Sequence, residues 1–371
     1  MKICKVTTLT SVHTGSGKYL QKDIEFITGN DRAVVIDDRK VLGIIGKGNI
    51  DKWIACINRG SSLMDLIRTI KSDVEPDDIA LRGMDLLATH FAHARTLREQ
   101  MLSGGDIPLI PGSSIKGSIR TAVLNHLLDQ YQFTPFLRDE IFNRRNRIDD
   151  KMVIKKHLGT STNNDLLRFL TVGDALFYFE TWACNILSMN MVRDGVRMEK
   201  RLGNLVECIP DNVEAEIRIN INQRQLELNA NKNYIRNNFD FLRSYNALFE
   251  VINSHTEKIL KAEFLFWRDD KMEGLVVDYL EKLQTILDDI HNCKPGECVL
   301  RVGHGGGWLD MTGGWAKEKK YIPDHEIWSA IVDKARPGNQ SKYSSYPFPK
   351  TRRMDNYGEL LGFIKLSIQN P

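Results

Sequence analysis

Four residues near position 115 have types and spacing that suit the binding of an anion. A Pro-Gly pair at 111–112 breaks the preceding element, and Ser113 is a good N-cap, so we expect a helix to begin there. A hydroxyl, an ammonium, a gap and a guanidinium then share one helix face: Ser113, Lys116, Gly117 and Arg120. The unpaired N–H groups and the positive dipole end of the first turn point to the same place. The pattern predicts a phosphate-binding helix start, and the alternative is a capped amphipathic helix with solvated charges.

The opposite face of the same helix is expected to be buried in the core. Apolar residues recur at helical spacing and predict a buried stripe: Ile115, Ile119, Ala122, Val123 and Leu127. Glycine inside a helix costs about 1 kcal/mol relative to alanine. Gly117 therefore indicates that something approaches the backbone closely, and Ser114 adds a second hydroxyl beside it.

A glycine-rich loop near the C-terminus is a second candidate ligand contact. It follows the strand expected at residues 298–302 and begins directly after Arg301 and Val302. Most of its positions lack a Cβ, so a ligand could come close: Gly303, Gly305, Gly306 and Gly307. A dinucleotide fingerprint is excluded because it requires glycine where Trp308 stands. A phosphate loop at Gly17-Lys18 is excluded too, because Val12 and Tyr19 occupy the positions that the motif specifies.

Basic residues gather in two segments of a nearly balanced chain. The 371 residues carry a net charge of +3, so any contact with a polyanion must come from local patches. Residues 138–157 hold seven Lys and Arg against four acids, and residues 317–353 hold nine against four. Six of these cations are candidate nucleic-acid contacts, and the alternative is that they lie in exposed loops: Arg144, Arg145, Arg147, Lys350, Arg352 and Arg353.

Histidines and cysteines offer two further kinds of chemistry. His13 could stack on a nucleic-acid base, or act as a general base, the role that histidine fills most often. Four residues have types that suit zinc, but their spacing is uncommon and a strand would separate them: His291, Cys293, Cys298 and His304. We therefore expect no metal, no cofactor and no catalytic residue.

Composition indicates a globular intracellular protein. With 42% hydrophobic residues the chain can bury a large core, as one elaborate domain or as two smaller ones. No apolar run approaches the roughly 20 residues of a membrane span, and no signal peptide is evident. Six scattered cysteines do not form a disulfide framework. These features predict a cytoplasmic protein without membrane contact.

Hydrophobic patterning predicts strands interrupted by helical segments. Strands are expected at residues 2–13, 34–36, 41–45, 170–181, 187–192, 206–209, 213–221, 298–302 and 364–368. Helices are expected at 50–57, 63–70, 86–101, from 113 onward, and within 232–291. A Pro-Asp-Asn turn at 210–212 predicts a hairpin between 206–209 and 213–221. We expect a loop at 13–18, a helical insertion or lid at 44–104, a largely helical segment at 228–296, and a glycine-rich loop with a C-terminal strand at 297–371.

Three motifs together resemble the RAMP proteins of CRISPR systems. These are His13–Gly17 after the first strand, Ile110–Gly117 opening a helix, and the glycine-rich loop. Residues Gly303–Trp308, Phe348–Arg352 and Leu361–Phe363 are most similar to the fifth-subunit family of type III-A (Csm) effector complexes. The resemblance implies an α+β fold with a modified ferredoxin-like (RRM-type) core and helical insertions. This is a single elaborated module over 1–371, which two pseudo-related halves could compose.

The resemblance also implies a function and partners. A subunit of this kind binds the 3′ part of the CRISPR RNA, caps a backbone filament built from a related RAMP subunit, and supports CRISPR RNA maturation without catalysis. The small helical subunit and host nucleases are further candidate partners. Cleavage of target RNA by backbone subunits requires an aspartate that neither Asp37 nor Asp38 matches. The alternative is a metal-independent endoribonuclease that processes precursor CRISPR RNA with His13.

Overall fold

The chain forms a mixed α and β fold, which confirms the α+β class. The computed structural model describes residues 1–29, 31–88, 93–143, 145, 150–192, 195–229, 239–267, 274–311, 313–335 and 348–369. Its strands build two larger sheets and a short pair formed by β7 (Leu109–Ile110) and β9 (Ala175–Leu176). Among the described residues, no helix is both long enough and apolar enough to cross a bilayer.

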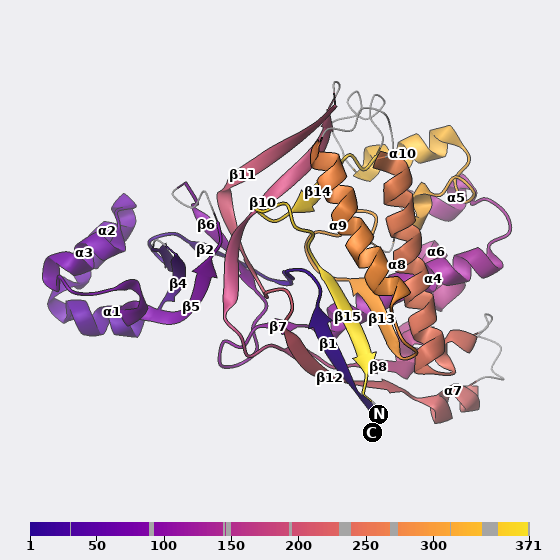
Figure 1. Ribbon diagram of the computed structural model, residues 1–371, viewed down its shortest axis with the longest axis horizontal. Helices are drawn as coiled ribbons and strands as arrows, with labels where there is room; N and C mark the ends of the chain where they lie inside the picture. Colours follow the sequence, from indigo (N-terminus) through magenta and orange to yellow (C-terminus); the bar gives the residue numbers. More distant parts are fainter. Residues whose placement is uncertain are drawn as a thin grey trace.

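The first sheet is antiparallel and lies at the end where the two termini meet (Figure 1). Its strands follow the order β13 (Glu297–Arg301), β15 (Phe363–Ile368), β1 (Lys2–Thr8), β12 (Glu214–Ile221) and β8 (Leu170–Val172). The alternation predicted for β12 is confirmed, because Ala215, Ile217 and Ile219 are buried and the residues between them face outward. Each fully buried aliphatic side chain of this kind stabilises the fold by about 1.5–3 kcal/mol.

The second sheet mixes parallel and antiparallel pairs. Its strands follow the order β2 (Gly15–Gln21), β6 (Thr96–Gln100), β11 (Gly195–Cys208), β10 (Thr181–Val192), β5 (Ala80–Leu86), β4 (Arg32–Ile36) and β3 (Phe26–Thr28), and β14 (Thr351–Met354) pairs with β10. The pairs β6–β11 and β5–β10 are parallel. Strand β2 occupies much of the loop expected at 13–18.

The strand expected at 41–45 is wrong, because these residues belong to helix α1 (Asp38–Ile45). Two other local predictions are wrong because of tertiary pairing. The helix expected at 86–101 is wrong for the described residues 96–100, which form β6 between β2 and β11. The hairpin expected between 206–209 and 213–221 is also absent. Residues up to Cys208 pair with β10 in the second sheet, whereas β12 pairs with β1 and β8 in the first. The turn at 210–212 therefore transfers the chain between sheets.

The three longest helices cover the first sheet with several shorter ones nearby, and a smaller helical group lies at the opposite end of the molecule (Figure 1). The helices near the first sheet are α4 (Gly112–Tyr131), α5 (Arg138–Ile141), α6 (Asp150–Leu158), α7 (Gln223–Asn229), α8 (Tyr245–Trp267), α9 (Gly274–His291) and α10 (His325–Ala335). The distant group is α1 (Asp38–Ile45), α2 (Ile50–Arg59) and α3 (Leu63–Ile70). The segment 44–104 thus contains helices but also β5 and β6, and 228–296 includes α8 and α9.

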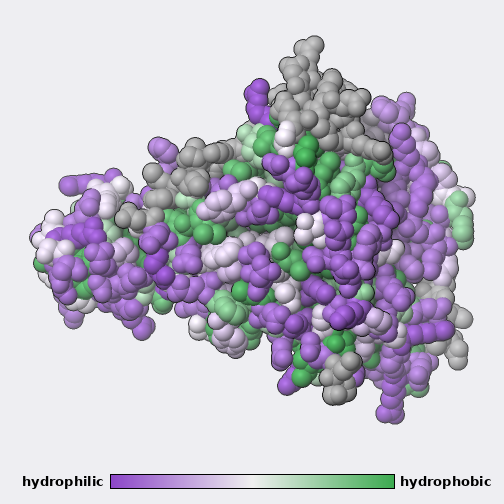
Figure 2. Space-filling model, in the orientation of Figure 1, coloured by the Kyte–Doolittle hydropathy of each residue, from purple (hydrophilic) through white to green (hydrophobic). Residues whose placement is uncertain are grey.

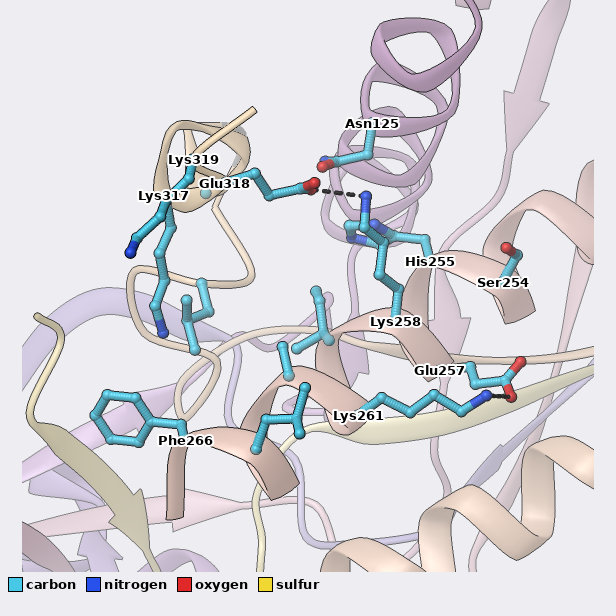
Figure 3. Close-up of a pocket in the computed structure, with 15 residues that line it drawn as sticks. Asn125, Ser254, His255, Glu257, Lys258, Lys261, Phe266, Lys317, Glu318 and Lys319 are labelled. Carbon is cyan, nitrogen blue, oxygen red and sulfur yellow. Dashed lines mark ion pairs between the residues drawn. The ribbon is translucent and has the colours of Figure 1, made fainter. Parts of the chain in front are cut away.

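Short 3₁₀ turns complete the described elements: η1 (Lys47–Asn49), η2 (Pro76–Ile79), η3 (Thr162–Asn164), η4 (Leu166–Phe169), η5 (Asp240–Leu242) and η6 (Gly314–Lys317). The face drawn in Figure 2 is mainly hydrophilic, with hydrophobic residues in small separate patches. Helix α8, Asn125 of α4 and residues around η6 line a pocket (Figure 3).

Three chain segments that are distant in sequence meet at one place, which we call the junction: residues 11–14, 302–304 and 361–362. His304 N–H donates to the carbonyl oxygen of His13 at 2.8 Å, and Val302 N–H donates to that of Gly362 at 2.7 Å. Gly303 has φ +68°, and a Cβ there would lie 2.2 Å from the His13 carbonyl oxygen. Only glycine allows this approach of two backbones.

A buried ion pair joins α8 to β14. Arg352 donates to both carboxylate oxygens of Glu263, from Nε to Oε2 and from Nη2 to Oε1 at 2.6 Å, and the side chains of Glu263 and Arg352 are 4% and 7% exposed. Tyr279 and Trp267 also donate to Glu263 Oε2, at 3.0 and 3.3 Å. Burial raises the pKa of Glu263, but the charge and hydrogen bonds of Arg352 more than offset this and hold the pKa below its usual value.

The junction predicts that two glycines of one loop respond differently to alanine. Gly303 and Gly307 both have positive φ, but no other residue lies within 4 Å of a Cβ at Gly307. Gly307→Ala should lower the free energy of unfolding by about 1–2 kcal/mol, the cost of left-handed backbone alone. Gly303→Ala should cost clearly more, because it adds a clash with the backbone. Urea unfolding compares the two, and equal losses would contradict the close contact.

Breaking the buried ion pair should destabilise the protein more than removing both charges. Glu263→Gln leaves Arg352 buried without its counter-charge and should lower the free energy of unfolding by about 3 kcal/mol. The double variant Glu263→Leu with Arg352→Met should recover most of that loss. The control is Arg243→Met, which removes an exposed pair with Asp240 and should change stability by less than about 0.5 kcal/mol. If Glu263→Gln behaved like the control, the pair would have no structural role.

Candidate nucleic-acid interface

The central helix α4 begins one residue earlier than expected. Pro111 occupies the N-cap position, and its carbonyl oxygen accepts from the N–H groups of Ser114 and Ile115. The prediction that Ser113 caps the helix is therefore wrong, and Ser113 is an exposed residue of the first turn. Gly112 N–H donates to Asp174 Oδ1 at 2.7 Å. One carboxylate of the protein already meets the positive end of the helix.

The two cations predicted on α4 have partners within the chain. Lys116 Nζ donates to the Leu170 carbonyl oxygen at 2.7 Å, and Arg120 Nη1 lies 2.6 Å from Asp165 Oδ2. Burial lowers the pKa of Lys116, although the charge of Asp165 opposes this effect. A Cβ on Gly117 would meet nothing within 4 Å, so the protein itself does not require glycine there. The helix surface at Gly117 is exposed and free of obstruction, with Ser114 half-buried one turn before it.

His13 is enclosed in the junction. Its side chain is 1% exposed, and Nδ1 donates to the Glu207 carbonyl oxygen at 2.6 Å. Burial lowers the pKa of His13 to about 4, and the charge of Arg98 adds to this effect. The imidazole is thus neutral at pH 7 and shielded from RNA, so we omit His13 from the contacts proposed below.

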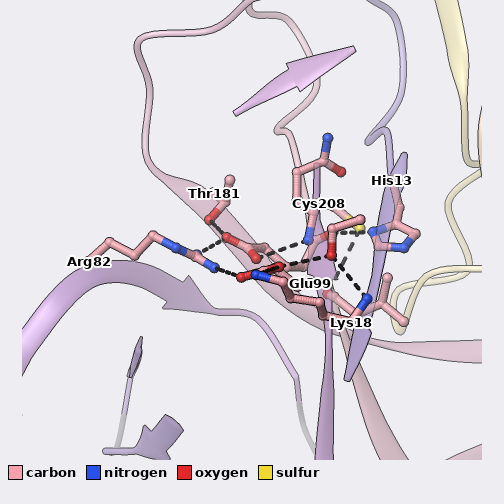
Figure 4. Close-up of polar contacts among 10 residues, drawn as sticks. His13, Lys18, Arg82, Glu99, Thr181 and Cys208 are labelled. Carbon is pink, nitrogen blue, oxygen red and sulfur yellow. Dashed lines mark hydrogen bonds and ion pairs between the residues drawn. The ribbon is translucent and has the colours of Figure 1, made fainter. Parts of the chain in front are cut away.

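A buried polar network beneath His13 was not found from the sequence (Figure 4). Gln100 is fully buried, and its amide bonds to Thr14 and to the Leu109 carbonyl oxygen at 2.8–2.9 Å. Leu109 lies three residues before Gly112. Gln100 therefore connects the first motif to the segment that leads into α4.

The carboxylates of the same network share one guanidinium. Arg82 binds both Glu207, which is 0% exposed, and Glu99, whose Oε1 is 3.3 Å away. Thr181 Oγ1 also donates to Glu207, at 2.7 Å, and Ser16 Oγ donates to Glu99 at 2.8 Å. These bonds fix β2, β5, β6, β10 and β11 relative to one another.

Three cationic or ionisable side chains meet at the outer side of the junction, and we call them the basic cluster: Arg98, His304 and Arg353. Arg98 Nη1 lies 3.1 Å from His304 Nδ1, and Arg353 Nη1 lies 3.3 Å from each ring nitrogen of His304. The guanidinium of Arg98 also lies 5.5 Å from the ring centre of Tyr19, which is 48% exposed. Guanidinium groups beside an exposed aromatic ring can neutralise phosphate and stack a base.

The other predicted cations near the glycine-rich loop hold the fold. Arg301 Nε donates to the Leu361 carbonyl oxygen at 2.8 Å, and Nη1 lies 3.4 Å from Asp310. Arg352 is committed to Glu263. Gly305 and Gly306 pack against Leu361 and Asp310, whereas Gly307 is unobstructed. Lys350 is half-buried, and its carbonyl oxygen accepts from Met191 N–H.

The basic run before α6 is only partly described. Arg145 is exposed, and its N–H donates to Asn143 Oδ1 at 2.9 Å. Arg144 and Arg147 lie outside the described residues. Their role in RNA binding stays a prediction.

The candidate zinc ligands are not brought together. His291 Nε2 lies 3.2 Å from Glu257 Oε1, Cys298 is buried in β13, and His304 belongs to the basic cluster. Within the described ranges, no group of three His, Cys, Asp or Glu could hold a metal. The zinc alternative is therefore wrong for these four residues.

Sequence and structure comparisons extend this picture. A relative from Methanocaldococcus jannaschii, described as "CRISPR system Cms protein Csm5", is 24% identical over 319 residues, which are 80% of this chain and 70% of the relative. One chain of a cryo-EM structure of a Csm-crRNA-target RNA ternary complex in a type III-A CRISPR-Cas system superposes with a TM-score of 0.74 at 17% identity, covering 100% of both chains. The crystal structure of T. onnurineus Csm5 superposes with a TM-score of 0.64 at 16% identity, covering 97% and 99%.

The two structural matches, at 17% and 16% identity, show the fold alone. The family is shown by a match to a family model. Residues 5–310 match the family model described as the RAMP superfamily. This match covers most of the chain and includes the first motif, α4 and the glycine-rich loop. The chain therefore belongs to the RAMP superfamily.

Proposed function

We propose that the protein is a non-catalytic RNA-binding subunit of a type III-A CRISPR (Csm) interference complex. In this role it binds the 3′ part of the CRISPR RNA, caps the backbone filament of a neighbouring RAMP subunit and supports CRISPR RNA maturation. The small helical subunit and host nucleases are further candidate partners. The likeness to Csm5 and to a chain of a Csm-crRNA-target RNA complex supports this assignment.

The basic cluster carries the proposal. It lies at the junction of residues 11–14, 302–304 and 361–362, and it combines two guanidinium groups with the exposed ring of Tyr19. Backbone phosphates and unstacked bases of single-stranded RNA match such a surface without sequence readout.

The surface of α4 around Gly117 is the second proposed contact. Lys116 and Arg120 keep partial exposure, and their partners, a carbonyl oxygen and one carboxylate, leave donor groups available. Gly117 leaves room for a strand to pass over the helix. The first sheet, with α4 and α8 packed on it, is consistent with a modified ferredoxin-like core, which we include in the proposal.

The endoribonuclease alternative receives no support from His13. A buried, neutral imidazole that donates to a backbone carbonyl cannot reach a ribose 2′-hydroxyl. Asp37 accepts from Arg39 N–H at 2.9 Å as the N-cap of α1, which gives it a structural use.

Removing the basic cluster should weaken RNA binding and reduce its salt dependence. We expect Arg98→Ala with Arg353→Ala to lower the affinity for single-stranded RNA about tenfold at low salt, and the slope of log K against log salt by up to about 1.4, since each phosphate contributes about 0.7. Fluorescence anisotropy over a salt series measures both. The matched control is Arg39→Ala with Arg59→Ala on α1 and α2, which should bind like the unmodified protein.

Two outcomes would oppose the proposal. An unchanged slope in the cluster variant would remove the cluster from the RNA path. Cleavage of labelled precursor RNA by the unmodified protein in EDTA, abolished by His13→Ala, would favour the nuclease alternative.

Substitution of Gly117 should weaken RNA binding while it stabilises the fold. Gly117→Glu and Gly117→Gln both replace a helix-interior glycine at an unobstructed site, so each should raise the free energy of unfolding by up to about 1 kcal/mol. We expect Glu to weaken RNA binding several-fold through charge repulsion and bulk, and Gln to weaken it less. Thermal melting and anisotropy check the two effects. Unchanged binding by both variants would exclude RNA from this helix face.

A further inference from the structure

The pocket beside α8 differs in chemistry from the proposed RNA surface. It has a volume of about 1180 Å³ and contains none of the predicted RNA-binding residues. Its lining residues on α8 run from Ser254 to Phe266, which is about 18 Å along a helix. The site is therefore a groove long enough for about five residues of an extended chain.

The floor of the groove is apolar. The apolar lining residues that form this floor are Ile259, Ala262, Leu265 and Phe266 on α8, together with Leu309, which follows the glycine-rich loop. Leu265 is 71% exposed, although it is a large aliphatic side chain. Such a surface gains free energy when apolar side chains of a partner cover it.

Lysines surround this floor. Lys258, Lys261, Lys317 and Lys319 line the groove against two carboxylates, Glu257 and Glu318. Lys261 pairs with Glu257 at 2.6 Å, and Lys258 pairs with Glu318 at 2.7 Å (Figure 3). The two pairs leave Lys317 and Lys319 as cations without an ion pair among the described residues.

Lys317 is the more constrained of the two. Its ammonium lies 4.6 Å from the ring centre of Phe266. Burial lowers the pKa of Lys317 to about 8; the charge of Glu263 opposes this effect, and that of Arg352 reinforces it. Burial disfavours the charged form of Lys317, so a carboxylate brought into the groove would stabilise that form.

The aromatic content of the groove argues against RNA as its occupant. The lining contains two aromatic rings, those of His255, whose Nδ1 is buried, and Phe266, whose ring already contacts Lys317 at 4.6 Å and the guanidinium of Arg352 at 5.0 Å. Single-stranded RNA sites rely on aromatic faces that bases can stack on. An aliphatic floor with cationic edges instead matches a peptide that presents alternating apolar and acidic side chains.

We propose that this groove docks an acidic segment of a partner protein, with apolar side chains on Leu265 and its neighbours and carboxylates on Lys317 and Lys319. The site is separate from the RNA surface and does not depend on the proposed function. It gives the protein a second recognition surface of a different chemical class.

Synthetic peptides test this proposal on the full-length protein. The first probe is a fluorescein-labelled peptide that repeats Asp-Leu-Glu-Phe. The second replaces its acids with lysine, and the third replaces its Leu and Phe with serine. We expect anisotropy to detect binding of the first probe only. Equal binding of the third probe would overturn the proposal by reducing the site to charge attraction, and no binding of the first probe up to about millimolar concentration would overturn it outright.

Variants then locate the binding. Lys319→Glu with Leu265→Glu changes two exposed side chains and leaves the buried pair of Glu263 intact. This variant should weaken binding of the first peptide at least about tenfold, because it creates like-charge contacts and removes an apolar anchor. The matched control is Lys52→Glu with Lys71→Glu, two exposed lysines in the distant helical group, which should stay within about twofold of the unmodified protein.

A third variant and a competing ligand complete the test. Lys317→Met keeps the stem of the side chain and removes the charge, and it should weaken the peptide several-fold while thermal melting checks the fold. Oligouridylate should not compete with the peptide. Full competition, together with loss of oligouridylate binding in the Lys319→Glu and Leu265→Glu variant, would assign the groove to RNA instead.

Discussion

The contact between Gly303 and the carbonyl oxygen of His13 constrains much of this structure. It joins the first and last parts of the chain through backbone atoms, which no change of rotamer can relax. The contact requires a residue without a Cβ at positive φ, so sequence and geometry are tied at this point. Because His304 follows Gly303 directly, the same contact sets where the basic cluster can form.

The buried polar network gives the junction its fixed position on the second sheet. Gln100 uses its amide to bind Thr14 and the segment before α4, and Arg82 holds the carboxylates of Glu99 and Glu207 together. Buried polar groups are costly when unpaired, so a network with these bonds disfavours other arrangements of the strands. Arg98 lies on the same strand as Gln100 and points to the basic cluster as a result.

Hydrophobic periodicity can be predicted well from this sequence, but the pairing of the strands cannot. The alternation at 213–221 reports which face is buried, and that prediction is confirmed. The turn residues at 210–212 predict a change of chain direction but not which strands pair. The predicted hairpin is wrong because β11 pairs with β10 and β12 pairs with β1. Arg98 was missed for a related reason. Residues 96–100 alternate like a strand, but the surrounding residues suggested a helix, and their true partners β2 and β11 are distant in sequence.

Charge in the sequence likewise does not separate structural cations from binding cations. Arg301, Arg352 and Arg353 were all predicted to contact RNA. Arg301 and Arg352 form ion pairs with Asp310 and Glu263, whereas Arg353 lies against His304.

The contacts of Arg301 also connect the two proposed surfaces. Its guanidinium binds Leu361 beside the junction and Asp310 next to Leu309, which lines the groove. Arg301 thereby holds the glycine-rich loop between these surfaces. The basic cluster and the groove share no side chain, so RNA and a peptide can be bound at the same time.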